Sequence, residues 1–288
     1  MSSARSHQRP ASPACFRLGR LAGRGRALTA LCTTAGTAAG LGAAAIMLFR
    51  AQGRLARKRI GKPLGELAPQ ADRTYKKKLG DPLQLLVLGD SIAAGLGAER
   101  PKDTLGARLA RGLAKRSERA VRLHTAAVVG SESSALAQQL SDLPEDYRPD
   151  LAVIVVGGND VTHRIPPGQA CSRLAAAIEA LQKLGASVVI GTCPDLGTLR
   201  PVPQPLRSVA SLASRRMAAL QAQTARRCGA EYVMLGRIVG PMFRDEPEAM
   251  FSIDRFHPSS TGYRRTAKAM LPVLLRQLSA PEVQPPAL

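Results

Sequence analysis

Two apolar runs of strand length place the tightest limit on how this chain can fold. Residues 83–88 and 151–156 are almost entirely aliphatic, and the second run contains no polar residue at all. A strand with such a pattern has no face that suits water, so both of its faces must be buried. The two runs therefore indicate a sheet that other elements cover on both sides.

From residue 83 onward, apolar and β-branched runs alternate with helical patterns. The expected strands lie at 83–88, 121–129, 151–156, 187–191 and 231–235, and the expected helices at 104–117, 131–140, 169–184, 206–228 and 260–278. This succession implies parallel strands joined by right-handed crossovers. We predict an α/β fold, a three-layer α/β/α sandwich with five parallel strands, in which Gly185 and Gly229 end the third and fourth helices.

A serine follows the first run at the place where open α/β sheets carry their chemistry. The run ends in Gly89-Asp90-Ser91, so Ser91 lies just beyond the carboxyl end of a buried strand. A serine hydroxyl is a weak nucleophile unless a base takes its proton and a third group orients that base. Asp254 and His257 supply both, because their spacing lets the carboxylate bind one ring nitrogen while the other ring nitrogen faces Ser91.

The second apolar run leads into a segment that suits an oxyanion hole. It continues as Gly157-Gly158-Asn159-Asp160, in which the two glycines permit a tight turn beside a ligand. Asn159 then presents an amide donor at the carboxyl end of the strand. One such donor can stabilise a transition state by roughly 3 kcal/mol.

With these motifs in this order, the sequence resembles the SGNH (GDSL-type) family of serine esterases over residues 83–275. The resemblance makes Ser91 the nucleophile and the first oxyanion donor, through its backbone N–H. It makes Gly130 and Asn159 the other two oxyanion donors, and Asp254 with His257 the final Asp-x-x-His-Pro block. Two positions depart from the family pattern, since Ile92 replaces a leucine and Gly130 lacks the asparagine that often precedes it.

The resemblance implies a carboxylic ester hydrolase that forms an acyl-enzyme on Ser91 and needs neither a metal nor an organic cofactor. Its substrate would be a small-molecule or glycan ester, handled as by an esterase, a lipase or a carbohydrate deacetylase. Two alternatives remain at this point: an acyltransferase that passes the acyl group to cell-envelope glycans, and a noncatalytic binding module that keeps the fold. The oligomeric state and the acyl chain length stay open.

Several neighbours of these motifs are candidates for supporting roles. His163 follows the Asn159 block and competes with His257 as a base, although a polar loop histidine is usually solvated. Asp90 and Asp160 flank the expected site residues, and we expect them to bind backbone N–H groups. Cys193 ends an expected strand near the rim of the site, where its thiol could line the pocket, and the proline-rich segment 195–205 is expected to shape that pocket.

The amino-terminal region differs from the rest in charge and hydropathy. Residues 1–80 hold 16 Lys and Arg but only 2 Asp and Glu, so most of the net charge of +20 lies there. From Ala27 to Phe49 no side chain is charged, and a helix of that length spans about 34 Å, enough to cross a bilayer core. We expect a single-pass membrane anchor at 27–49, with a cleaved signal peptide or a buried or disordered low-complexity segment as alternatives.

This interpretation divides the chain into five parts. They are a basic tail at 1–26, the anchor or signal-like segment at 27–49, a basic linker at 50–80, the hydrolase domain at 81–278 and a flexible proline-rich tail at 279–288. Cations flank the anchor on both sides, so the membrane orientation is not determined.

The basic composition also raises the question of a nucleic-acid partner. Such a partner is disfavoured, because no aromatic residues are interleaved with the basic ones. No Cys-x-x-Cys motif indicates a zinc or redox site.

Overall fold

A computed structural model describes residues 44–279 of the chain. The predicted tail at 1–26, most of the predicted anchor at 27–49 and nearly all of the tail at 279–288 lie outside the described residues. Residues 44–60 are helical. Within the described part of the chain, no helix combines the length and the apolar character needed to cross a bilayer.

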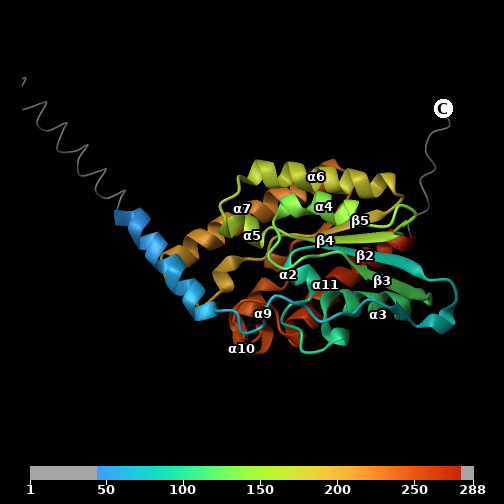
Figure 1. Cartoon of the computed structure of the whole chain (residues 1–288), viewed down its shortest axis with the longest axis horizontal. Helices are drawn as coiled ribbons and strands as arrows, with labels where there is room; N and C mark the ends of the chain where they lie inside the picture. The colour runs from blue at the N-terminus through green and yellow to red at the C-terminus, as the bar shows by residue number, and fades with distance from the viewer. Residues whose placement is uncertain (1–43, 280–288) are drawn as a thin grey trace, which may run out of the picture. The chain divides into compact units, whose positions relative to one another are not determined.

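The described residues form one sheet of six strands in the order β1-β3-β2-β4-β5-β6 (Figure 1). The five strands from β2 to β6 pair in parallel, as predicted. The strands are β1 (Thr74–Tyr75), β2 (Leu83–Gly89), β3 (Val121–Thr125), β4 (Leu151–Val155), β5 (Ser187–Gly191) and β6 (Glu231–Val233).

Helices cover both faces of the sheet, which confirms the predicted sandwich. The long helices are α3 (Leu105–Ser117), α6 (Pro167–Lys183), α7 (Leu206–Arg227) and α11 (Ser260–Ser279). The short α-helices are α2 (Ser91–Ala94), α4 (Leu136–Ser141), α5 (Gly158–Thr162), α8 (Leu235–Ile238), α9 (Gly240–Asp245) and α10 (Pro247–Met250). The 3-10 helices are η1 (Lys77–Leu79), η2 (Pro101–Asp103), η3 (Ser133–Ala135) and η4 (Leu196–Thr198).

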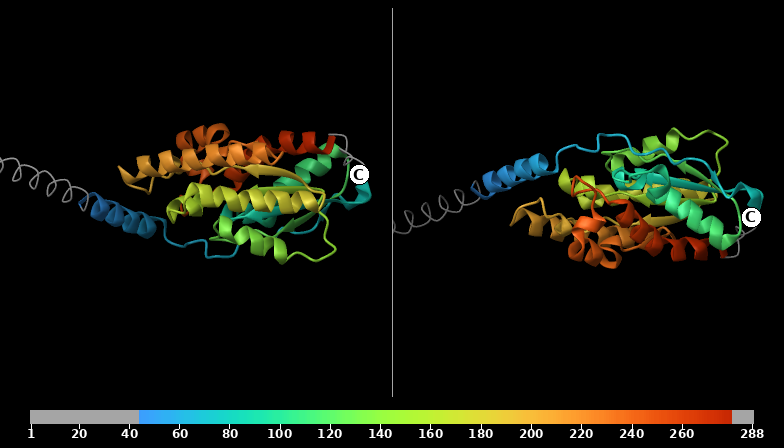
Figure 2. Two further views of the ribbon diagram at one scale, coloured as in Figure 1. Left: turned by 90° about the horizontal axis from the view of Figure 1, so that it is seen from above. Right: turned by 90° about the horizontal axis from the view of Figure 1, so that it is seen from below.

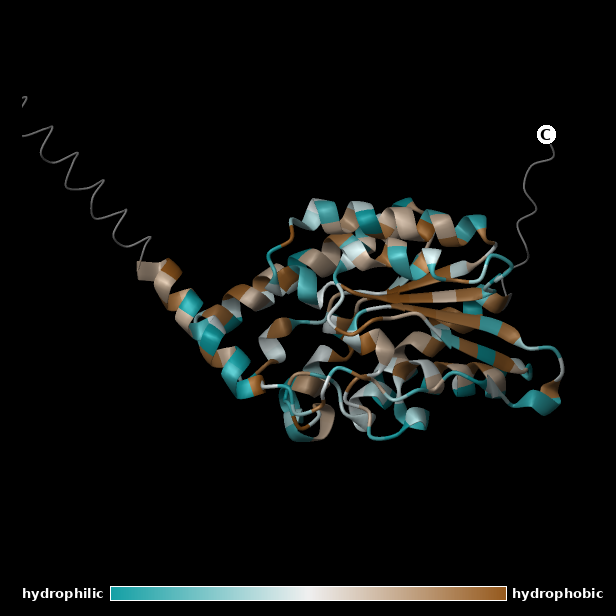
Figure 3. Cartoon of the chain, in the orientation of Figure 1, coloured by the Kyte–Doolittle hydropathy of each residue, from teal (hydrophilic) through white to brown (hydrophobic). Residues whose placement is uncertain are grey.

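The core lies in two layers because side chains alternate along each central strand. In β4, Val153 packs with α3 and α11, whereas Ile154 packs with α6 on the opposite face. The views from above and below show these two helix layers, and the central strands are the most hydrophobic ribbons of the structure (Figures 2 and 3). Both faces of the strand are dry, so a continuous apolar run is the pattern that this sheet requires.

The prediction of a five-stranded, wholly parallel sheet was incomplete. β1 adds a sixth strand that pairs antiparallel with β3, through Thr74 opposite Arg122 and Tyr75 opposite Val121. Tyr75 is buried, and its hydroxyl donates to Ala71 O at 2.8 Å. A strand of only two residues is too short to show a hydrophobic periodicity. The sequence therefore could not reveal β1 within a stretch that was predicted to be a linker.

The junction between β2 and β4 fixes where the polar motifs meet. Gly89 pairs with Val155, so Ser91 and Asn159 both follow strands that end at the same level of the sheet. Gly89 has φ +128°, and a Cβ there would lie 1.9 Å from Val155 O. Any side chain would push the two strands apart, because the obstructing atom belongs to the backbone. The glycine before Asp90 is therefore a requirement of the strand pairing.

Candidate active site

Ser91, His257 and Asp254 form one hydrogen-bonded line at the carboxyl edge of the sheet. The distance from Ser91 Oγ to His257 Nε2 is 2.9 Å, and the distance from His257 Nδ1 to Asp254 Oδ2 is 2.5 Å. The serine and the carboxylate are both buried, whereas the imidazole is partly exposed. The structure thus brings together two sequence segments that are 166 residues apart.

The Asp254 carboxyl is held in its ionised form. Burial raises its pKa, but the hydrogen bond from His257 and those from the backbone N–H groups of Phe256 and His257 outweigh burial and lower the pKa. Those N–H groups donate to Asp254 Oδ1 at 2.9 and 3.0 Å. An ionised carboxylate only accepts hydrogen bonds, so His257 Nδ1 carries a proton and Nε2 is free to accept from Ser91.

A tight turn fixes the imidazole against the serine. Arg255 has φ +55°, in the left-handed region, and its N–H donates to Ser252 O at 2.8 Å. The Phe256 ring meets the His257 ring edge-on, with centroids 4.8 Å apart. Gly97 then packs against the turn so closely that a Cβ on it would lie 2.6 Å from Pro258 O. The segment after Ser91 and the His257 turn are therefore in direct contact.

Asp90 sets the backbone at the serine, as expected for a supporting carboxyl. It is the N-cap of α2, and its Oδ1 accepts from Ile92 N at 3.0 Å. Burial raises the pKa of Asp90 to about 7, although the backbone hydrogen bond from Ile92 opposes that shift. The N–H of Ser91, at the first position of α2, has no hydrogen-bond partner among the described residues. Free N–H groups at the start of a helix are suited to binding a negative oxygen.

The structure places Asn159 in the same cavity as Ser91 but not Gly130. Asn159 Nδ2 donates to Ser131 O at 2.8 Å, and an amide nitrogen has a second hydrogen to offer. Gly130 is exposed in a turn with φ +84°, and this turn lies beside the end of β2, since Val128 N donates to Gly89 O at 3.1 Å. Gly130 as an oxyanion donor remains a prediction.

Two further contacts hold the Gly130 loop in place. The fully buried Asp160 accepts from Ser133 N at 3.1 Å and from Ser133 Oγ at 2.6 Å, which confirms its expected role of binding a backbone N–H. His163 is exposed and pairs with Glu132, with Nδ1 and Oε1 2.7 Å apart. His257, not His163, is therefore the histidine beside Ser91.

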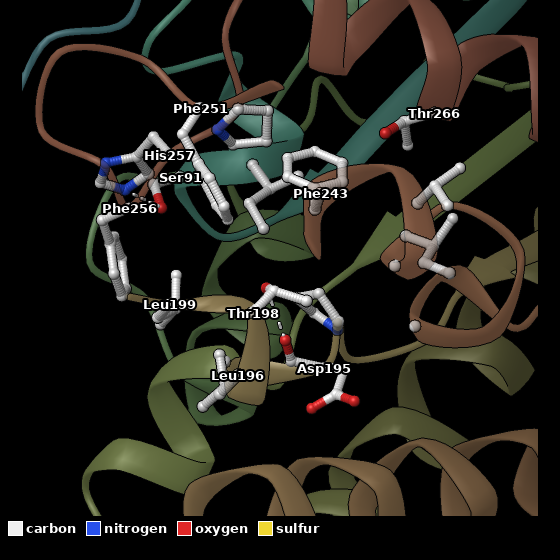
Figure 4. Close-up of a pocket in the computed structure, with 18 of the residues that line it drawn as sticks. Ser91, Asp195, Leu196, Thr198, Leu199, Phe243, Phe251, Phe256, His257 and Thr266 are labelled. Carbon is white, nitrogen blue, oxygen red and sulfur yellow. Dashed lines mark hydrogen bonds between the residues drawn. The ribbon is translucent and has the colours of Figure 1, made fainter. Parts of the chain in front are cut away.

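A mostly apolar cavity opens beside the serine. It encloses about 730 Å³ including its open mouth, and three of the chain's five phenylalanines line it. Figure 4 shows Ser91 and His257 at one end of the cavity, Thr266 at the other, and Phe243 between them. Many of the other lining residues come from η4, α8, α9 and the segment that leads to His257; they include Leu196, Thr198, Leu199, Leu235, Val239, Phe251 and Phe256.

The predicted contribution of residues 195–205 to the pocket is confirmed, because Asp195, Leu196 and Thr198 line the cavity.

The Cys193 thiol, by contrast, does not line the cavity. It is buried among apolar side chains, and burial raises the pKa of its thiol well above the ordinary value. A buried thiol of this kind packs as a small apolar residue. Among the described residues, no group of three potential ligands could hold a metal ion.

The sequence did not reveal two buried glutamines that join helices to the strand ends. Gln139 pairs with the backbone of Gly89, donating to its carbonyl and accepting from its N–H, both at 2.9 Å. Gln221 accepts from Cys193 N at 2.7 Å and donates to Val156 O at 2.9 Å. The one available signal was Gln221's helical spacing from the apolar Met217, which places it on the core face of α7.

Comparisons with known proteins agree with this geometry. Residues 87–265 match the GDSL-like lipase/acylhydrolase family. The chain is 38% identical over 211 residues to a GDSL-like esterase of Mycobacterium tuberculosis, covering 69% of this chain and 67% of the relative.

Solved structures show the same fold at lower identity. A lipase/acylhydrolase of Enterococcus faecalis has a TM-score of 0.55 and 17% identity, with 70% of this chain and 100% of that chain covered. An acetyl-xylooligosaccharide esterase of Geobacillus has a TM-score of 0.53 and 20% identity, with 72% and 99% covered. On the family match and the curated relative, the chain belongs to the GDSL-like lipase/acylhydrolase (SGNH hydrolase) family and is a carboxylic ester hydrolase.

Proposed function

We propose that this esterase acts through an acyl-enzyme on Ser91 and prefers esters with an apolar acyl group. The observation that carries the proposal is the hydrogen-bonded line from Asp254 through His257 to Ser91, because Ser91 opens into an apolar cavity. Ser91 Oγ attacks the ester carbonyl while His257 Nε2 takes its proton. The imidazolium then gives that proton to the departing alcohol, and water releases the acyl group by the same steps.

The negative oxygen formed in each step needs donors that are already in place. The free N–H of Ser91 and the second hydrogen on Asn159 Nδ2 are two such groups at the edge of the cavity. Each donor contributes roughly 3 kcal/mol to a transition state of this kind. Gly130 N–H, in the neighbouring turn, is the third donor that we propose.

The cavity supports the choice of acyl group. Phe243, Leu196 and Val239 line it beyond Ser91, and an alkyl chain in contact with them would leave water. Burial of each methylene group contributes about 0.8 kcal/mol. An acetyl group would leave most of this surface without a partner, so the cavity favours acyl chains longer than acetyl.

The test is hydrolysis of p-nitrophenyl esters, from acetate to octanoate, by the full chain and by Ser91→Ala, His257→Ala and Asp254→Asn. We expect each substitution to lower kcat by about a thousandfold or more, and kcat/KM of the unchanged chain to rise from acetate to octanoate. A fluorophosphonate probe should label the chain but not Ser91→Ala. Turnover that survives in Ser91→Ala would exclude the acyl-enzyme, and a maximum at acetate would indicate a deacetylase.

A further inference from the structure

Two segments that are far apart in the sequence meet beside the cavity, and neither contains an acidic residue. They are the helical residues 52–60 and residues 196–216, which run from η4 into α7. Gln52 joins them, because its Nε2 donates to Gln204 O at 2.6 Å and its Oε1 accepts from Leu206 N at 3.0 Å. We refer to the exposed side chains of these two segments as the basic face.

The basic face carries seven exposed cations. Its exposed basic side chains are Arg54, Arg57, Lys58, Arg59, Arg200, Arg215 and Arg216. The acids that approach it are few: Arg215 Nε lies 4.0 Å from the buried Asp195 Oδ2, and Arg200 Nη1 lies 3.8 Å from the exposed Glu248 Oε1. Asp195 is also shared with Arg244, at 3.9 Å. Most of these exposed cations therefore have no acidic partner among the described residues.

The same two segments also expose aliphatic side chains. Leu55 is 40% exposed, Val209 48% and Leu212 68%. Val209, Leu212 and Arg216 recur on one side of α7 at spacings of three and four residues, so they form a single exposed stripe. A helix surface that mixes arginines with exposed aliphatic residues is the pattern of an interfacial helix. Nucleic acid would instead favour aromatic residues for stacking, and these two segments contain none.

The basic face continues directly into the wall of the ester cavity. Leu196, Thr198 and Leu199, from the same acid-free segment, line the cavity. We propose that the basic face docks on an anionic lipid surface and holds this wall of the cavity against the membrane. The cations bind lipid phosphates, and Leu55, Val209 and Leu212 enter the headgroup region. The proposal goes beyond the esterase activity and does not depend on it.

The experiment measures hydrogen–deuterium exchange of the full chain on vesicles. It uses the Ser91→Ala protein, so that hydrolysis of lipid cannot affect the result, and compares pure phosphatidylcholine with a mixture containing about 30% phosphatidylglycerol, which mimics an anionic leaflet. We expect amides in 52–60 and 206–216 to exchange at least about fivefold more slowly on the anionic vesicles, and high salt to remove the difference. Because the exchange is measured for the amides of these two segments alone, contacts between the vesicle and other parts of the chain do not affect the comparison of neutral with anionic vesicles.

Matched variants separate this face from charge in general. Arg54→Gln/Arg57→Gln/Arg216→Gln should lose the protection, since each cation near an anionic surface contributes roughly fivefold in affinity. Lys115→Gln/Arg116→Gln/Arg119→Gln removes three exposed cations just before β3 begins, at the amino edge of the sheet, and should keep the protection. Leu212→Ser leaves the charge unchanged but removes an exposed aliphatic side chain, so it should weaken the protection of these amides on anionic vesicles.

Equal exchange on neutral and anionic vesicles, with the protein bound to both, would overturn the proposal. Equal loss of protection in the two triple variants would also overturn it, because it would show a response to net charge alone. Protection by a DNA duplex that persists in Leu212→Ser, without protection by anionic vesicles, would identify nucleic acid as the partner instead.

Discussion

At the residue scale, two buried carboxyls in this site have pKa values that shift in opposite directions. Asp254 accepts hydrogen bonds from an imidazole and two backbone N–H groups, and these outweigh its burial and lower its pKa. Asp90 is dominated by burial, which raises its pKa to about 7. The difference follows from the number of donors aimed at each group. Asp254 is therefore available as an ionised partner for His257, whereas Asp90 is held in place at a cost in stability.

The first stability prediction concerns Asp90→Asn. Since the folded-state pKa lies above the ordinary value of 3.8, the folded chain keeps a proton that the unfolded chain loses between about pH 4 and pH 7. The contribution of Asp90 to the stability of wild type therefore falls as pH rises through this window, by up to about 4 kcal/mol. Asparagine cannot titrate and is also a good N-cap. The free energy of unfolding of Asp90→Asn, relative to wild type, should increase with pH.

Urea denaturation of both proteins at several pH values checks this expectation. The quantity of interest is the change in the difference between the two proteins, because other groups contribute equally to both. A difference that stays constant from about pH 4 to pH 8 would show that the Asp90 carboxyl is solvated in the folded chain.

At the element scale, the strand ends that position Ser91 and Asn159 are held by side chains of helices. Gln139 on α4 binds both backbone groups of Gly89, and Gln221 on α7 binds Cys193 N and Val156 O. Beyond a strand's last ladder bond, backbone groups need other partners if they are buried. The two amides supply those partners.

We predict that Gln221→Met destabilises the fold by roughly 2–6 kcal/mol. Methionine has a similar volume but leaves a buried N–H and a buried carbonyl without partners, at about 1–3 kcal/mol each. The control is Gln223→Met, because Gln223 is exposed on the same helix, and it should change stability by less than about 0.5 kcal/mol. Chemical denaturation gives both values. Similar small effects in the two variants would mean that water replaces the Gln221 side chain.

At the scale of the whole molecule, the cavity is a joint product of segments from most of the described chain. Ser91 follows β2, Leu196 lies in η4, Phe243 in α9 and Thr266 in α11. The position of Thr266 at the end away from Ser91 makes it a measure of cavity length (Figure 4). A longer side chain there should shorten the acyl chain that fits.

We therefore predict that Thr266→Met lowers kcat/KM for the octanoate ester about tenfold or more, because the loss of one methylene group's space in an apolar pocket costs about 1–3 kcal/mol. Hydrolysis of the acetate ester should change by less than about threefold. Lys268→Met, on the exposed side of the same helix, is the control and should affect neither ester. A parallel loss for acetate and octanoate in Thr266→Met would show damage to the site and not a shorter cavity.

The sequence alone determined the features whose cause is local. Continuous apolar runs identified the central strands that are buried on both faces. The spacing of Asp254 and His257 placed them on one turn, where they are indeed hydrogen bonded.

Only the tertiary structure decided the features that depend on distant segments. β1 is a strand because β3 offers it an edge, and Gln221 is a buried ligand of the backbone because two strands end beside it. The short helices α8 and α9 carry almost no periodic signal, yet they form much of the cavity wall. A local pattern records which face of an element is buried, but the partner that buries it is chosen by packing across the whole fold.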